Sequence, residues 1–205
     1  MDIQRVETYM KRVAESETKT FTPVGDKLKV GLDLGTAYIV MVVLDEENNP
    51  IACEKQAADV LRDGVVVDYL GALNIVKALK AKLEQRIGKE LVNCAIAMPA
   101  GTDDSVKTHT YVAEGAELEV TAVLDEPSAA NAIYQISDGV IVDIGGGTCA
   151  LKRWQGCGDC RRTDRWYAPD FGAFRKLPYS VCRSRSHQTG LFQTSGDPSD
   201  SETGY

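Results

Sequence analysis

Two short turns in this sequence combine an aspartate with glycines: Asp33-Leu34-Gly35-Thr36 and Asp143-Ile144-Gly145-Gly146-Gly147-Thr148. Each follows an apolar run, at residues 28–32 and 139–142, that predicts a buried strand. Glycines at the end of a strand let backbone N–H groups approach an anion closely, and the neighbouring carboxylate can hold a hydrated Mg²⁺. The two turns together therefore predict a site for phosphate groups and a metal ion.

A third segment with chemical potential lies between the two turns, at residues 125–132. Pro127 suits the first position of a helix, and the small residues that follow it allow close packing against a neighbouring element. Glu126 comes just before this helix, where its carboxylate can reach a cleft. We therefore add Glu126 to Asp33 and Asp143 as a candidate catalytic carboxylate.

The elements that would position these residues alternate between strands and helices. Strands are predicted at residues 28–32, 38–44, 51–57, 92–98, 120–124 and 139–142, and helices at residues 2–16, 69–87, 104–114 and 127–134. The apolar face of the first helix would consist of Ile3, Val6, Tyr9, Met10 and Val13. This order predicts an α/β fold with a mixed sheet. A strand followed by Asp, Gly and Thr recurs about 110 residues later, which suggests an internal structural duplication.

The bulk properties exclude several classes of protein. A formal charge of −7 over 205 residues argues against a nucleic-acid-binding surface as the main role. No segment is predicted to be a transmembrane span or a secretory signal, so we expect a cytoplasmic setting and reduced cysteines.

Other reactive side chains have structural interpretations. We expect Cys53 and Cys94 to be core thiols in strands, and His109 to lie solvated on a surface helix. Lys77, Lys80 and Lys82 are expected to form the wet face of their helix.

The three motifs together resemble those of the actin/Hsp70/sugar-kinase ATPase superfamily. The turns at Asp33 and Asp143 are similar to its phosphate-1 and phosphate-2 motifs, and residues 125–132 resemble the Glu-Pro-Thr-Ala-Ala-Ala linker of Hsp70 ATPase domains. Across residues 30–148 the resemblance is greatest to the EutJ family, Hsp70-like proteins found with ethanolamine-utilisation microcompartments. It implies an actin-like (ribonuclease H-like) ATPase fold whose first lobe is complete and whose second lobe is truncated.

The resemblance also implies roles for individual residues. Asp33 would hold Mg²⁺ through water, with Asp143 as the second metal residue, and Asp143 and Glu126 would orient the attacking water. The phosphates of ATP would lie between two sets of backbone groups, one from Gly35, Thr36 and Ala37, the other from Gly145, Gly146, Gly147 and Thr148.

The last part of the chain has a different composition. Residues 1–148 hold 14 Lys and Arg against 24 Asp and Glu, whereas residues 149–205 hold 9 against 6, together with both tryptophans and four of the six cysteines. Back-translation read one base later gives, over some fifty codons, strings that resemble the segment after phosphate-2 in EutJ and Hsp70. We therefore interpret residues 149–205 as an out-of-frame, disordered tail. The alternative is a genuine tail in which Cys157 and Cys160, with Cys149, Cys182 and His187, bind zinc.

These expectations divide the chain into an N-terminal helix and linker (1–27), a first lobe (28–137), the start of a second lobe (138–148) and the tail (149–205). The resemblance implies an ATP- and Mg²⁺-binding Hsp70-like chaperone or assembly factor, with protein clients or microcompartment enzymes as partners. Weak ATPase activity is expected of an intact protein and none of this chain. A non-catalytic actin-fold scaffold, a small-molecule kinase and a cytoskeletal filament ATPase remain as alternatives.

Overall fold

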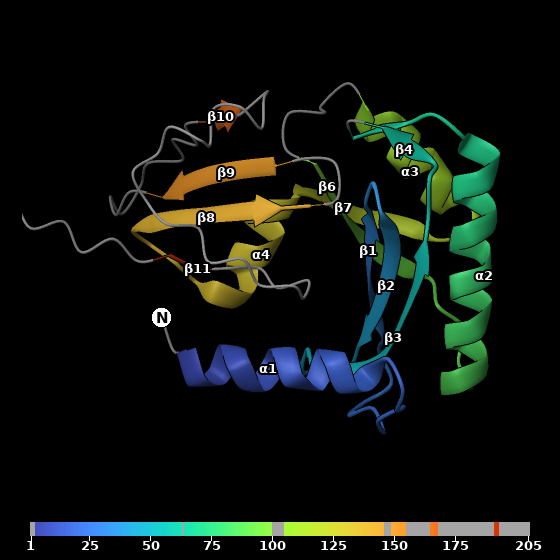
Figure 1. Ribbon diagram of the computed structural model, residues 1–205. Helices are drawn as coiled ribbons and strands as arrows, with labels where there is room; N and C mark the ends of the chain where they lie inside the picture. Colours follow the sequence, from blue (N-terminus) through green and yellow to red (C-terminus); the bar gives the residue numbers. More distant parts are fainter. Residues whose placement is uncertain are drawn as a thin grey trace, which may run out of the picture.

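The computed structural model describes residues 3–62, 64–99, 105–145, 149–154, 165–167 and 191–192. Its strands form two larger sheets and one short two-stranded ribbon, and helix α4 (Glu126–Tyr134) packs against both larger sheets (Figure 1). The observed order of strands and helices confirms the mixed α/β architecture.

The first sheet has five strands, in the spatial order β3-β2-β1-β6-β7. They are β1 (Lys29–Leu34), β2 (Tyr38–Leu44), β3 (Pro50–Ala57), β6 (Asn93–Met98) and β7 (Glu119–Asp125). β2 is antiparallel to both of its neighbours, whereas β1, β6 and β7 run parallel to one another. The carboxyl ends of β1, β6 and β7 therefore meet at one edge of the sheet.

One face of this sheet is covered by α2 (Tyr69–Ile87) and α3 (Val106–Gly115), on the right of Figure 1. Alternate residues of β1, Val30, Leu32 and Leu34, are buried against them in one continuous core. The two strands β4 (Leu61–Arg62) and β5 (Val65–Val66) form a separate short ribbon before α2.

The second sheet has the order β10-β9-β8-β11, and every adjacent pair is antiparallel. Its strands are β8 (Gly139–Ile144), β9 (Cys149–Trp154), β10 (Arg165–Tyr167) and β11 (Leu191–Phe192). β9 covers the first six residues of the segment that we interpret as a tail. The division of the chain into domains stays a prediction.

Helix α1 (Ile3–Ser16) runs below both sheets in Figure 1 and packs against β3 and α4. Of its predicted apolar face, Val6 is buried, whereas Ile3 and Met10 are exposed. Among the described residues, no helix is both long enough and apolar enough to cross a membrane.

Two expectations about individual side chains are wrong. His109 is fully buried, and its Nδ1 lies 2.9 Å from the main-chain oxygen of Ser105. Lys80 is buried too, because its ammonium donates to the main-chain oxygen of Glu117. Cys53 and Cys94 are buried free thiols, as predicted.

Candidate functional site

Three carboxylates from three elements come together where the two sheets meet. Asp33 lies near the end of β1, Glu126 is the first residue of α4, and Asp143 lies near the end of β8. Each strand runs one residue past its aspartate, to Leu34 and to Ile144, whereas the sequence pattern predicted a strand that ends at the aspartate. The sequence-based grouping of these three residues matches their arrangement; their catalytic roles stay predictions.

The electrostatics of this carboxylate cluster favour protons or a cation. Burial, and then the charge of Asp143, raise the pKa of Asp33 to about 7. Burial, followed by the charges of Asp33 and Asp143, also raises the pKa of Glu126 strongly. The pKa of Asp143 is raised by burial, although its hydrogen bond with Glu126 opposes this rise. Without a cation, the cluster therefore retains protons at neutral pH.

The turn between β1 and β2 contains buried oxygen atoms that lack a partner. Asp33 Oδ1 and Thr36 Oγ1 are enclosed, and neither has a hydrogen-bond partner among the described residues. Buried oxygens are rarely left in this condition, since it costs free energy. The two atoms therefore point to a ligand that supplies the missing interactions.

Gly35 sets the close approach of this turn. Its N–H donates to the main-chain oxygen of Tyr38 at 3.1 Å. A Cβ on Gly35 would lie 2.7 Å from that same oxygen and 3.7 Å from Asp33 Oδ1. The turn therefore requires glycine because backbone approaches the space that a side chain would fill. Ala37, the other predicted phosphate-1 residue, accepts a hydrogen bond from the N–H of Ala58.

Gly35→Ala is accordingly expected to weaken both the turn and any ligand binding at it. The added methyl forces the β1–β2 turn to shift, at a cost of about 1–3 kcal/mol in the free energy of unfolding. Chemical unfolding measures this loss. Gly31→Ala is the matched control, because a Cβ on Gly31 would meet its nearest neighbour at 4.0 Å, and a loss as large in this variant would contradict the prediction.

The second predicted turn is described only at its start. Gly145 follows β8 and is exposed. Ile144 pairs with Cys149, so residues 145–148 connect β8 to β9. Gly146, Gly147 and Thr148 lie outside the described residues, as do the side chains of the proposed zinc ligands, and their roles stay predictions.

A polar clamp that the sequence did not predict holds the start of α4. The Asp125 carboxylate accepts from the N–H of Ser128 at 2.9 Å, as an N-cap, and from Lys152 Nζ at 2.6 Å. Although burial alone would raise the pKa of Asp125, these hydrogen bonds hold it below its usual value. Lys152 also contacts Ser128 Oγ. Since Lys152 comes from β9, this clamp holds the start of α4, and with it Glu126, against the second sheet.

The run Asp125-Glu126-Pro127-Ser128 could have identified the cap on α4, because an Asp two residues before a Pro is typical of a helix start. Nothing in the sequence pairs Lys152 with it.

A hydrated cation fits the carboxylate cluster better than a directly bound one. In the part of the chain that the structure describes, no three His, Cys, Asp or Glu side chains are grouped so that they could ligate a metal ion themselves. Mg²⁺ commonly keeps several of its waters and takes only one or two carboxylates. The enclosed Asp33 Oδ1 and the cluster's negative potential suit such an ion.

Comparison with known proteins identifies relatives for much of the chain. The sequence profile described as Hsp70 protein matches residues 70–152. The ethanolamine utilization protein EutJ of Escherichia coli K12 is 42% identical over 124 residues, which are 60% of this chain and 44% of that protein. EutJ of Salmonella typhimurium LT2 is 40% identical over the same length and with the same coverage. The chain thus spans less than half the length of these relatives.

A solved structure shows the same fold. The crystal structure of EutJ from Carboxydothermus hydrogenoformans matches with a TM-score of 0.73 and 38% sequence identity, over 82% of this chain and 62% of that one. The resemblance inferred from the phosphate turns and the linker is thus confirmed. The chain is similar to EutJ over part of that protein's length, matches the Hsp70 profile at residues 70–152, and has the mixed α/β fold of its actin-like ATPase relative.

Proposed function

We propose that this chain binds ATP·Mg²⁺ at the junction of the two sheets, as part of an Hsp70-like protein of ethanolamine utilisation that acts on other proteins. The observation that carries the proposal is the pair of enclosed oxygens without a partner, Asp33 Oδ1 and Thr36 Oγ1, beside the glycine turn. Phosphate oxygens and a hydrated cation supply the donors and the charge that this site lacks.

The chain's own residues would divide the work. The Gly35 turn brings backbone close to the phosphates, and the Asp33 carboxylate faces the hydrated cation. Glu126 and Asp143, which share a hydrogen bond, would orient a water molecule and accept its proton. The bound Mg²⁺ would neutralise charge on the phosphates.

The protein-directed role rests on the relatives' names. EutJ is named for ethanolamine utilization, and the matching profile for Hsp70 protein. We therefore propose a chaperone or assembly role in the cytoplasm, on protein clients such as the enzymes of a microcompartment. The scaffold alternative has less support, because a scaffold needs no cluster of three carboxylates with raised pKa values.

Fluorescent ATP-analogue titration of the 205-residue chain, with and without Mg²⁺, tests the binding proposal. We expect saturable, Mg²⁺-dependent binding, weaker than micromolar, that Asp33→Asn weakens by roughly ten-fold, since a charge-assisted contact is worth more than about 1.4 kcal/mol. Asp138→Asn is the matched control: Asp138 is exposed just before β8, and its loss should leave binding unchanged. Binding that ignores Mg²⁺, or an equal loss in both variants, would refute the proposal.

A further inference from the structure

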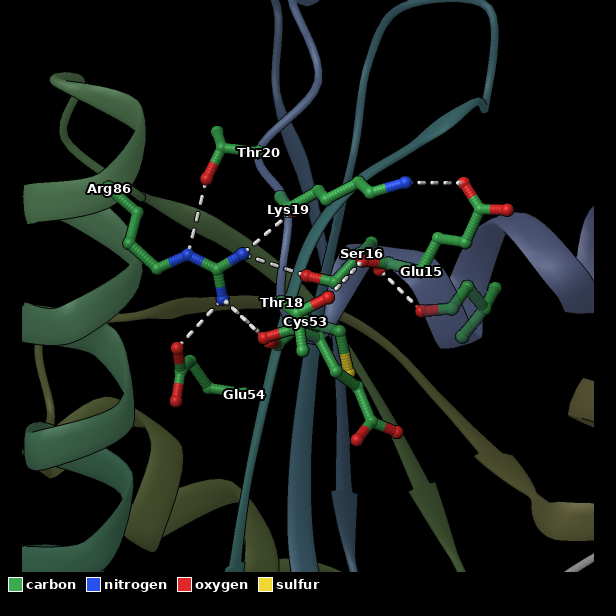
Figure 2. A network of polar contacts seen from close by, with 10 residues as sticks. Glu15, Ser16, Thr18, Lys19, Thr20, Cys53, Glu54 and Arg86 are labelled. Carbon is green, nitrogen blue, oxygen red and sulfur yellow. Dashed lines mark hydrogen bonds and ion pairs between the residues drawn. The ribbon is translucent and has the colours of Figure 1, made fainter.

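Helix α1 is held to the first sheet at its carboxyl end by one arginine, as Figure 2 shows. Arg86 of α2 donates to the main-chain oxygens of Ser16 and Lys19, each at 2.8 Å. The same guanidinium donates to the main-chain oxygen of Cys53 at 2.8 Å and to the Glu54 carboxylate at 2.7 Å, both in β3. Three elements, α1, α2 and β3, therefore share one network of charge-assisted hydrogen bonds.

A second attachment to the first sheet lies one turn earlier in α1. Arg12 Nε donates to the main-chain oxygen of Pro50 at 3.1 Å, and the guanidinium lies 4.8 Å from the centre of the Phe21 ring. The carboxyl-terminal half of α1 is thus fixed at two places along the edge strand β3.

The amino-terminal end of α1 contacts α4 and the second sheet. Val6 is buried in a small cluster with Tyr134, the last residue of α4, and Ile141 of β8. Arg5 donates to the main-chain oxygen of Ile133 at 3.2 Å, at an exposed position. Helix α1 packs less extensively against α4 than against β3, so its amino-terminal end is the weaker of the two attachments.

We propose that α1 is a strap between the two sheets, fixed on the first sheet and releasable from α4 and β8, which positions α4 and therefore Glu126. The part of this inference that concerns ligand binding rests on the proposed function.

The geometry of α4 explains how the strap reaches the site. Glu126 stands at one end of this nine-residue helix and Tyr134 at the other, roughly 12 Å apart at 1.5 Å per residue. A helix moves as a unit, so contact with α1 at Tyr134 restrains the angle of α4 and the position of the Glu126 carboxylate. Release of Val6 would free that angle while the Arg86 network kept α1 attached.

A simpler role for α1 would be to cover β3, which is the edge strand of the first sheet. The two roles differ in what Val6 does. A cover needs only the contacts with β3, whereas a strap needs the contact with Tyr134 and Ile141.

Hydrogen exchange of the whole chain without nucleotide separates the two roles. In Val6→Asp, we expect exchange to rise roughly ten-fold in residues 3–10 and in α4, with residues 13–16 and α2 unchanged, because only the weak attachment opens. Met10→Asp is the matched control: it makes the same kind of change one turn along the helix, at an exposed position. Val6→Ile should retain protection, and if Val6→Asp fails to fold, Val6→Ala should show the same pattern at about three-fold.

In Val6→Asp, faster exchange along the whole of α1, or no change in α4, would overturn the proposal that α1 is a strap. A second measurement adds the ligand: Val6→Asp should weaken Mg²⁺-dependent binding of the ATP analogue about five-fold, and Met10→Asp should not. Unaltered affinity in Val6→Asp would overturn the positioning of Glu126. If the unmodified chain binds no ATP analogue, the proposed function fails, while the exchange pattern still decides whether α1 restrains α4.

Discussion

Replacement of Arg86 by alanine is expected to lower the free energy of unfolding by about 3 kcal/mol. The guanidinium satisfies the main-chain oxygens of Ser16, Lys19 and Cys53 and the carboxylate of Glu54. The Arg86 and Glu54 side chains are only 20% and 21% exposed. Alanine would leave these acceptors without a donor at a place that water reaches only in part, and this loss dominates over the small entropy gain of the shorter side chain.

Urea unfolding followed by circular dichroism measures this effect. Lys82→Ala is the matched control because Lys82 lies on the exposed face of the same helix, where a change of less than about 0.5 kcal/mol is expected. Arg86→Lys should recover only part of the stability, since one ammonium cannot reach the acceptors on α1, on Lys19 and on β3 together. Equal losses in Arg86→Ala and Lys82→Ala would show that the network in Figure 2 does not stabilise the protein.

Helix α2 was the element best predicted from the sequence. Its observed bounds, Tyr69–Ile87, are those that the spacing of its apolar residues predicted. Asp68 caps its start by accepting from the N–H of Gly71, and Gly88 ends it with φ 73°. Both ends are determined by local chemistry, so the sequence alone was sufficient to place them.

Tertiary contacts explain why the predictions for some individual side chains were wrong. Nothing local distinguishes His109 from a solvated histidine, because its burial depends on the packing of α3 onto the first sheet. Lys80 lies on the helix face predicted to be wet, yet its ammonium donates a hydrogen bond to the main-chain oxygen of Glu117, 37 positions along the chain. The Arg86 network likewise joins residues 32–70 positions apart and has no periodic signal.

In the candidate site, too, features determined by local sequence could be predicted and features determined by tertiary contacts could not. Asp33, Glu126 and Asp143 could be grouped from the sequence because each stands at the end of a strand or the start of a helix, where ligands of α/β sheets bind. The clamp by Lys152 could not be predicted from the sequence, since it depends on how β9 pairs with β8 and faces the start of α4.

The ligand-free protein should lose stability as the pH rises from about 5 to 8, and Asp33→Asn should remove much of that loss. Burial and the charge of Asp143 raise the pKa of Asp33 to about 7, from 3.8 for the ordinary carboxyl group. A raised folded pKa means that the folded state binds the proton more tightly. The stabilisation is therefore complete below the unfolded pKa and is lost as the pH rises through 7. At pH 8 the neutral asparagine should be more stable than the wild type by about 2 kcal/mol.

Asp45 provides a control of opposite sign. Burial would raise its pKa, but hydrogen bonds from the Asn49 side chain and from the N–H groups of Asn49, Val24 and Glu47 lower it. Its contribution is therefore present above the unfolded pKa and is lost as the pH falls. Asp45→Asn should destabilise the protein at pH 8, whereas Asp33→Asn should stabilise it. Thermal unfolding at a series of pH values measures both variants.

The same pH series tests whether the loss of stability that follows ionisation of Asp33 is relieved by a bound cation. If a hydrated cation compensates the cluster's charge, Mg²⁺ added at pH 8 should raise the melting temperature of the wild type and have little effect on Asp33→Asn, since only the first retains the charged carboxylate. At pH 5 the effect should vanish, because protons occupy the cluster in place of the cation. A wild type whose stability is flat from pH 5 to 8, or an equal response of both proteins to Mg²⁺, would contradict the assignment of Asp33 to a cation.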